Sequence, residues 1–177
     1  MDLKVSIMKA QHRNILLAVT LIVGLFAINW LNSSSSIRPE LSFTDIDGQQ
    51  HSLSQYAGKP ILLTFWATDC PGCIQEMPDL VTLYEQYTAQ GLIMIEVAMA
   101  HDSLDHINAM RDERNLPFII TWDNNADIAL AFDNVRVTPT HFLIAPEGEI
   151  IMRKIGNINL DSMHEKLQKM GLKPREG

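Results

Sequence analysis

The chain is poor in cysteine, with two in 177 residues, at positions 70 and 73. With a single pair available, the sequence has no disulfide framework elsewhere in the fold, and it lacks the second cysteine pair of a typical structural zinc site. The six histidines are scattered and do not supply the missing ligand spacing. We therefore expect any thiol chemistry of this protein to take place at Cys70 and Cys73.

Charge is absent from a long stretch near the N-terminus. No charged residue occurs at positions 14–37, and residues 15–31 are almost wholly apolar. As a helix this span would be about 26 Å long, close to the bilayer's hydrocarbon thickness of about 30 Å. Basic residues precede it, and Trp30 lies at its far end, where an indole suits the membrane interface. The pattern predicts a single-pass anchor in the inner membrane, with residues 1–14 in the cytoplasm and the rest in the periplasm.

A cleaved secretory signal is the alternative to an anchor. The apolar stretch is longer than the roughly 7–15 residues usual for a signal, and no Ala-x-Ala site follows it, although Ser33–Ser36 are small enough for a signal peptidase. Both interpretations export the remainder of the chain. We predict a flexible serine-rich tether at residues 32–38 and one folded domain at residues 39–177.

Positive charge is also scarce beyond the N-terminus. The formal net charge is −7, and residues 1–13 carry +2, which leaves −9 on the rest of the chain. An acidic domain is poorly suited to bind nucleic acid or anionic membrane surfaces. Nucleic acid is therefore not an expected partner.

Hydrophobic patterning predicts an α/β domain. The continuous apolar run at 60–66 is typical of a strand buried on both faces, which indicates a mixed or parallel sheet covered by helices. Before it, Asp47-Gly48 predicts the turn of a small β-hairpin. After it, a helical pattern starts at the cysteines and ends at Gly91. Further segments are predicted as strands at 92–100 and 117–122, helices at 103–115, 126–132 and 160–170, and a hairpin within 140–155.

The position of Cys70 and Cys73 at the start of that helix favours redox chemistry. Two cysteines three residues apart can form a small disulfide ring, and the orphan N–H groups and dipole of the first helical turn favour a thiolate. Cys70 is then the attacking thiol and Cys73 the resolving thiol. Pro71 suits the first helical position. A purely structural disulfide would close a tiny loop and add little stability.

Residues 39–170 resemble the membrane-anchored bacterial thioredoxin-like proteins of the TlpA/ResA type, in the AhpC/TSA–redoxin superfamily. The resemblance rests on the motif WAT-x-C-x-x-C-x-x-E-x-P from Trp66 to Pro78, and on VTPT-x-FLI-x-P-x-G from Val137 to Gly148. It implies a thioredoxin-like fold, with a central mixed sheet flanked by helices and an N-terminal hairpin extension.

The resemblance assigns roles to two residues outside the cysteine pair. Pro139 matches the proline whose bond to the preceding Thr138 is cis and which faces the cysteines beside the client's backbone. Glu76 matches a glutamate that accepts or relays the proton of the resolving thiol, although a solvated surface carboxylate is the alternative. Thioredoxin has an aspartate where this chain has Thr64, which cannot titrate.

The residues expected to contact the client surround the motif, and two of them bear on its redox direction. Asp69 replaces the tryptophan usual in this group, and an anion beside Cys70 opposes its ionisation. The dipeptide between the cysteines contains no histidine. Because a stabilised thiolate makes a strong oxidant, this pair is predicted to be a moderate reductant. The expected client contacts are Trp66, Asp69, Pro71, Gly72 and Thr138.

The function that follows is an exported, membrane-tethered thiol–disulfide oxidoreductase that reduces disulfides of client proteins and needs no cofactor. The resemblance implies clients such as apocytochrome c or copper-site proteins, and electrons from a membrane thiol relay.

Two other functions remain open. A thiol peroxidase of the redoxin superfamily is disfavoured because Thr68-Asp69-Cys70 breaks the Thr-x-x-Cys spacing. A copper-delivery module would use the dithiol with a histidine such as His141, since soft thiolates bind Cu(I).

Overall fold

The computed structural model describes residues 19–24 and 39–175. Residues 19–24 are helical, and the rest of the predicted anchor at 15–31 lies outside the described residues, as do residues 1–14 and the predicted tether at 32–38. Within the described part of the chain, no helix is long and apolar enough to cross a membrane.

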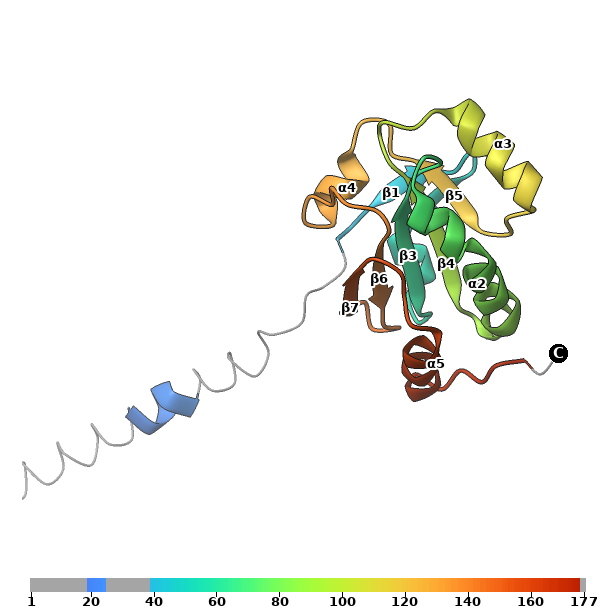
Figure 1. The fold of residues 1–177 in the computed structure, drawn as a ribbon. Helices are drawn as coiled ribbons and strands as arrows, with labels where there is room; N and C mark the ends of the chain where they lie inside the picture. The colour runs from blue at the N-terminus through green and yellow to red at the C-terminus, as the bar shows by residue number, and fades with distance from the viewer. Residues whose placement is uncertain (1–18, 25–38, 176–177) are drawn as a thin grey trace, which may run out of the picture. The chain divides into compact units, whose positions relative to one another are not determined.

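Residues 39–175 build a five-stranded mixed sheet in the order β5–β4–β3–β6–β7 (Figure 1). The central strand β3 runs parallel to β4 and antiparallel to β6. All six residues of β3 are buried, which confirms the prediction of a strand covered on both faces. The strands are β3 (Ile61–Trp66), β4 (Ile93–Ala98), β5 (Ile119–Trp122), β6 (Thr140–Ile144) and β7 (Ile150–Ile155).

Every predicted helix and hairpin of this domain is present, with bounds that differ by a few residues. A two-stranded hairpin precedes the sheet and leads into a short 3-10 helix. The hairpin consists of β1 (Ser42–Thr44) and β2 (Gln50–Ser52), and the 3-10 helix is η1 (Leu53–Tyr56). The helices are α2 (Pro71–Tyr87), α3 (Leu104–Arg114), α4 (Asp127–Ala131) and α5 (Leu160–Lys169), with the 3-10 turn η2 (Thr88–Gln90) after α2.

Helix α2 begins and ends as its sequence predicts. Cys70 is the N-cap and Pro71 occupies the first helical position, where the missing N–H costs nothing. At the other end, η2 closes on Gly91, whose φ of 104° is in the left-handed region that glycine tolerates best. This helix therefore starts at the cysteine pair and carries its side chains onto the sheet.

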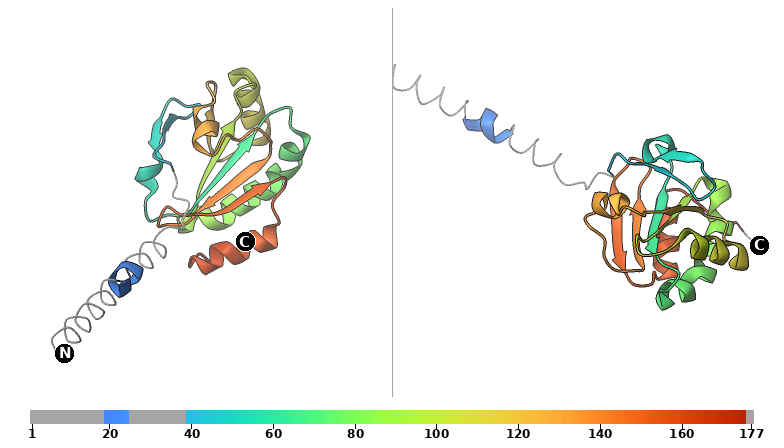
Figure 2. Two further views of the ribbon diagram at one scale, coloured as in Figure 1. Left: turned by 90° about the vertical axis from the view of Figure 1, so that its left-hand side faces the viewer. Right: turned by 90° about the horizontal axis from the view of Figure 1, so that it is seen from above.

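The sheet separates two cores of different character. The α2 face packs apolar side chains of α2 and α5 against β3 and β4, among them Leu62, Trp66, Met77 and Leu167. The opposite face, called the hairpin face here, packs the β-hairpin, η1 and α4 against the same strands, with Phe65, Phe132 and Phe142 at its centre. Figure 2 shows α5 on one side of the sheet and the hairpin on the other.

Candidate active site

Cys70 and Cys73 form a disulfide at the N-terminus of α2, with their Cα atoms 5.3 Å apart. The backbone N–H of Cys73 donates to Cys70 Sγ at 3.2 Å. This is the contact expected of a helix N-terminus that stabilises a thiolate. Cys70 is 8% exposed and Cys73 3%. Cys70 is thus the more exposed of the two residues, as the predicted order of attack and resolution requires.

The turn before Cys70 is held by Asp102, in the loop between β4 and α3. Its carboxylate accepts hydrogen bonds from the backbone N–H of Thr68 at 2.7 Å and from its hydroxyl at 2.8 Å. It also accepts from the N–H of Ser103 at 2.8 Å. These bonds fix the loop against the cysteine turn, a role that the sequence does not reveal because the partners are 34 residues apart.

A histidine contacts Asp69, the residue before Cys70. Its Oδ1 is 3.3 Å from Nε2 of His101, and the two side chains are 75% and 57% exposed. The sequence predicted the anion but not its histidine neighbour, which is close to Asp69 only in the fold. Because both groups are in solvent, their effect on Cys70 is screened.

Pro139 faces the cysteine turn, as expected. The Thr138–Pro139 bond is cis. A Cβ added to Gly72 would come within 3.5 Å of Pro139 Cδ and 3.2 Å of Asn157 Oδ1. Pro139 O also accepts from the N–H of Gly156 at 2.9 Å. The Pro139 loop and the loop between β7 and α5 therefore close around residues 70–73.

Four of the five expected client contacts are accessible, and one is not. Asp69 and Pro71 are exposed, and Gly72 and Thr138 are partly exposed. Trp66 is only 1% exposed, because it is the last residue of the central strand and its ring packs in the core of the α2 face. The prediction that Trp66 contacts the client directly is therefore wrong.

Glu76 is buried, at 2% exposure, so the alternative of a solvated surface carboxylate is wrong. Its Oε1 accepts a hydrogen bond from the N–H of Ile158, in the loop between β7 and α5. Its Oε2 is 3.0 Å from Nε2 of His141 on β6. Glu76 lies one helical turn after Cys73, on the side of α2 that faces the sheet.

His141 belongs to a buried polar row that crosses the sheet under α2. Its Nδ1 is 3.2 Å from the hydroxyl of Thr64 on β3, and Glu96 of β4 is the next residue in register. Burial raises the pKa of Glu96 well above its usual 4.5; the hydrogen bond from Thr64 opposes this shift, and the charge of Glu76 adds to it. We call His141, Thr64 and Glu96 the polar row.

The sequence did not point to Glu96, and it suggested His141 only as a copper ligand. The available signal was a polar residue within each apolar strand, Thr64 in ILLTFW and Glu96 in IMIEVA. Both ring nitrogens of His141 are engaged by Glu76 and Thr64, which does not favour copper binding with the cysteines. Among the described residues, no group of three or more His, Cys, Asp or Glu side chains could hold a metal ion.

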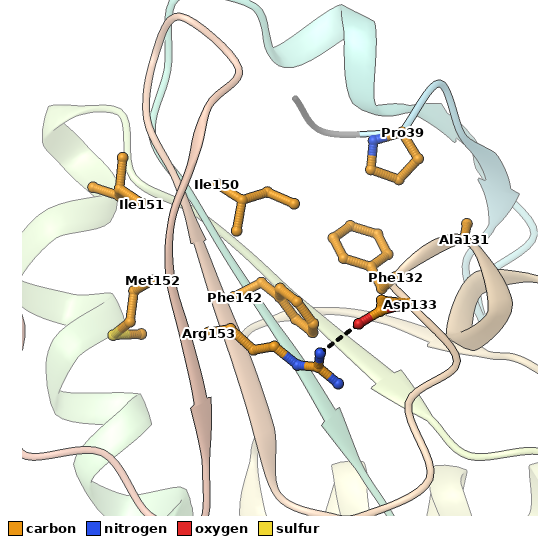
Figure 3. Close-up of a pocket in the computed structure, with 9 residues that line it drawn as sticks. All are labelled: Pro39, Ala131, Phe132, Asp133, Phe142, Ile150, Ile151, Met152 and Arg153. Atoms are coloured by element: carbon orange, nitrogen blue, oxygen red, sulfur yellow. Dashed lines mark hydrogen bonds and ion pairs between the residues drawn. The ribbon is translucent and has the colours of Figure 1, made fainter. Parts of the chain in front are cut away.

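A separate pocket lies on the hairpin face (Figure 3). Phe132 and Phe142 line it, and Arg153 spans its rim with an ion pair to Asp133 at 2.7 Å. The guanidinium also sits 5.6 Å from the centre of the Phe142 ring. Neither cysteine lines this pocket, so the redox chemistry belongs to the surface around residues 70–73.

Comparison with known proteins agrees with this geometry. The chain is 30% identical over 172 residues to the thiol-disulfide oxidoreductase ResA of Geobacillus kaustophilus, covering 91% of this chain and 98% of the relative. It is 28% identical to ResA of Bacillus subtilis over 84% of this chain and 82% of that one.

A solved structure shows the same fold. The thioredoxin-family thiol:disulfide interchange protein of Chlorobium tepidum superposes with a TM-score of 0.71 at 20% identity, over 78% of this chain and 97% of that one. The predicted thioredoxin-like fold is therefore confirmed. The model of the AhpC/TSA family matches residues 36–153. The chain belongs to the AhpC/TSA family and is a thiol–disulfide oxidoreductase of the thioredoxin and ResA type.

Proposed function

We propose that this oxidoreductase is tethered to the inner membrane by residues 15–31 and reduces disulfides of periplasmic client proteins. The observation that carries the activity is the position of Cys70. Its sulfur accepts the N–H of Cys73 at the start of α2, beside the accessible residues Pro71 and Gly72. A client segment lying along Pro139 would present its disulfide to this sulfur.

The proposed reaction has two exchange steps. The Cys70 thiolate attacks a client sulfur, forms a mixed disulfide and expels the second client sulfur as a thiolate. Cys73 then loses its proton to Glu76 and attacks Cys70 Sγ, which releases the first client sulfur. Two electrons pass from the Cys70–Cys73 dithiol to the client, whose two thiolates take protons from solvent. A membrane thiol relay would return the enzyme to its reduced form.

Glu76 is suited to the proton transfer because α2 places it one turn beyond Cys73 and the fold buries it. A carboxylate in a site with little water can take the thiol proton at the moment of attack. Glu76→Gln keeps the shape and removes the base. We expect the resolution step to slow by about 100-fold in this variant.

The direction of the reaction is testable by the redox potential. Asp69 opposes ionisation of Cys70, and the exposed His101 lies 3.3 Å from its carboxylate. We expect the domain to equilibrate with glutathione or dithiothreitol as a moderate reductant. A potential near about −120 mV, typical of a strong oxidant, would contradict the reductive assignment.

Clients are identified by trapping. Cys73→Ser removes the resolving thiol, so a client attacked by Cys70 stays covalently bound and can be named by mass spectrometry. Apocytochrome c and copper-site proteins are the proposed clients. Cys70→Ser is the control and should trap none. If Cys73→Ser yields no adduct in cells, the exchange mechanism is wrong.

Location is tested with the full chain. We expect protease added to spheroplasts to remove the domain while residues 1–14 stay protected, and carbonate washing to leave the intact chain in the membrane. Release of the domain by the wash would favour the cleaved signal instead.

A further inference from the structure

The polar row lies on the buried α2 face of the sheet, where the neighbouring strand side chains are apolar. His141, Thr64 and Glu96 are 0%, 1% and 2% exposed, and they occupy neighbouring positions across β6, β3 and β4. An unsatisfied buried polar group costs about 1–3 kcal/mol. The side chains above and below the row in β3 and β4, on the same face, are Leu62, Trp66, Met94 and Ala98.

Contacts join the row to the cysteine helix. Glu76 Oε2 lies 3.0 Å from His141 Nε2, and His141 Nδ1 lies 3.2 Å from Thr64 Oγ1. Thr64 lies in register with Glu96 on β4, which places its hydroxyl beside the Glu96 carboxyl group. A hydroxyl and an imidazole can each donate and accept at once. The chain from Glu76 to Glu96 can therefore pass a proton in either direction.

The row is not a fully satisfied structural network. Glu76 Oε2, His141 Nε2 and Glu96 Oε1 are buried and lack an aligned hydrogen-bond partner. Glu76 Oε2 and His141 Nε2 are nevertheless in contact at 3.0 Å. A purely structural network is usually fully paired, and the Glu96 carboxyl group departs from that rule.

We propose that His141 is a positioning residue that connects Glu76 through Thr64 to Glu96, so that the polar row holds the proton released by Cys73. The proposal rests on the proposed function, in which Glu76 accepts that proton. When the Cys73 S–H bond breaks, the proton goes to Glu76 and is shared with His141. Glu96 and Thr64 reorient their hydrogen bonds toward the ring, and the proton returns when the disulfide is reduced again.

Few other charged groups face the row. Beyond His141, β7 contributes Lys154, which is exposed. Beyond Glu96, β5 contributes the apolar Ile120. From α5, Met163 and Leu167 pack on the same face. With the cysteines themselves, Glu76, His141 and Glu96 are the groups that set its pH dependence.

Two threonines provide a matched test. Thr64→Val removes the hydroxyl that joins His141 to Glu96 and nearly preserves the shape. Thr121→Val is the control, because Thr121 is equally buried on β5, donates to Thr44 O at 2.8 Å and lies in register with Val97 of the hairpin face. Both variants lose one buried hydroxyl, and only the first interrupts the row.

The measurement is single-turnover release of the second thiol from a disulfide peptide, followed across roughly pH 5 to 9. We expect Thr64→Val to slow resolution about tenfold near neutral pH and to lose one inflection of the pH profile, while Thr121→Val stays within about twofold of the parent. His141→Gln and Glu96→Gln should lose the same inflection. A profile of Thr64→Val that matches that of Thr121→Val would overturn the proposal.

An infrared measurement tests the row without turnover. The spectrum of the reduced parent protein minus that of the oxidised form should contain a carboxylic acid C=O band that is lost in Glu96→Gln. Absence of that band in the parent would also overturn the proposal, even if a threonine variant fails to fold.

The variants separate this proposal from the proposed function. If Glu76→Gln slows resolution and Thr64→Val matches its control, only the polar row is excluded. If Glu76→Gln resolves at the parent rate, the role of Glu76 fails as well. Failure of the reductase function itself would instead appear as an absence of trapped clients in Cys73→Ser.

Discussion

The two faces of the sheet are formed by the same strands but bury different kinds of side chain. The hairpin face is stabilised by aromatic packing, with Phe132 4.9 Å from Phe142 and 5.8 Å from Phe65 between ring centres. The α2 face buries two carboxyl groups and an imidazole under the cysteine helix. Strand β3 serves both, since Phe65 points to one face and Thr64 to the other.

The difference indicates where stability and chemistry lie. Apolar burial stabilises a fold in proportion to area and needs no partner. A buried carboxyl group is costly unless its hydrogen bonds are complete, and Glu96 Oε1 has none. We therefore expect substitutions on the hairpin face to change stability and those on the α2 face to change the reaction.

The largest effect is expected from Phe132→Ala. Phe132 is 2% exposed and packs between two other rings, so its truncation leaves a cavity. We expect a loss of about 3–5 kcal/mol in the free energy of unfolding, measured by urea denaturation. The redox potential of the remaining folded protein should equal that of the parent. A changed potential would show that the two faces are coupled.

Glu96→Met tests the α2 face, by replacing a buried carboxyl group with an apolar side chain. Methionine fills a similar space without a polar group, so the free energy of unfolding should rise by about 1–3 kcal/mol. The gain should also depend on pH. Because the pKa of Glu96 is raised in the folded state, the parent loses stability as pH rises above 4.5, and the variant does not. Urea denaturation at several pH values measures both effects.

A loss of stability in Glu96→Met at every pH would mean that the row is held by complete hydrogen bonds. Glu96→Gln is the control for the charge alone. Glutamine keeps the shape of a polar side chain. The free energy of unfolding of this variant should therefore no longer depend on the titration of residue 96, but it should rise less than in Glu96→Met.

Local patterns in the sequence predicted most of the fold. The doubly buried strand, the helix that starts at Cys70 and the closing glycine each depend on neighbouring residues, which the sequence contains in order. The burial of Glu76 depends on Ile158 and His141, which are close only in the fold. For the same reason, the sequence could not show that His101 lies beside Asp69.

Trp66 shows a second reason why part of the site could not be predicted from the sequence. A family motif places it next to the cysteines, but its side of the strand decides whether it meets a client or the core. Because β3 is buried on both faces, the alternation of its side chains did not show which face Trp66 would meet.

Asp45, in the turn of the β-hairpin, should have a smaller effect on stability than Glu96, with the opposite dependence on pH. Burial alone would raise the pKa of Asp45, but hydrogen bonds from His51 and from the N–H groups of Gln49 and Asp47 outweigh it and lower the pKa below 3.8. Asp45→Asn should cost about 1 kcal/mol near neutral pH. The parent should lose this advantage as pH falls below 3.8, because a lowered pKa stabilises only the ionised form. Acid titration of thermal unfolding measures it.

His51→Gln is the companion variant to Asp45→Asn. If the two losses add in the double variant, the Asp45–His51 contact at 2.8 Å contributes no coupling, and the lowered pKa comes from the backbone donors alone.

The smallest effect is expected at Gly72. A methyl group there would lie 3.2 Å from Asn157 Oδ1 and 3.5 Å from Pro139 Cδ, and the Asn157 side chain can shift by the few tenths of an ångström required. Gly72→Ala should therefore change the free energy of unfolding by less than about 0.5 kcal/mol. Because the methyl group narrows the approach to Cys70, the second-order rate constant for a peptide disulfide should fall about threefold, a barrier change of under about 1 kcal/mol.

Asn157→Ala separates crowding from other causes in the Gly72 variant. It removes the nearer neighbour, so the double variant should recover the parent rate with the peptide if crowding is the reason. A small thiol-reactive probe such as iodoacetamide needs less room than a peptide and should react with reduced Cys70 equally well in all four proteins. A slower reaction with the probe in Gly72→Ala would instead place the effect on the thiolate, because the added methyl group would then have disturbed the Cys73 N–H donor to Cys70 Sγ.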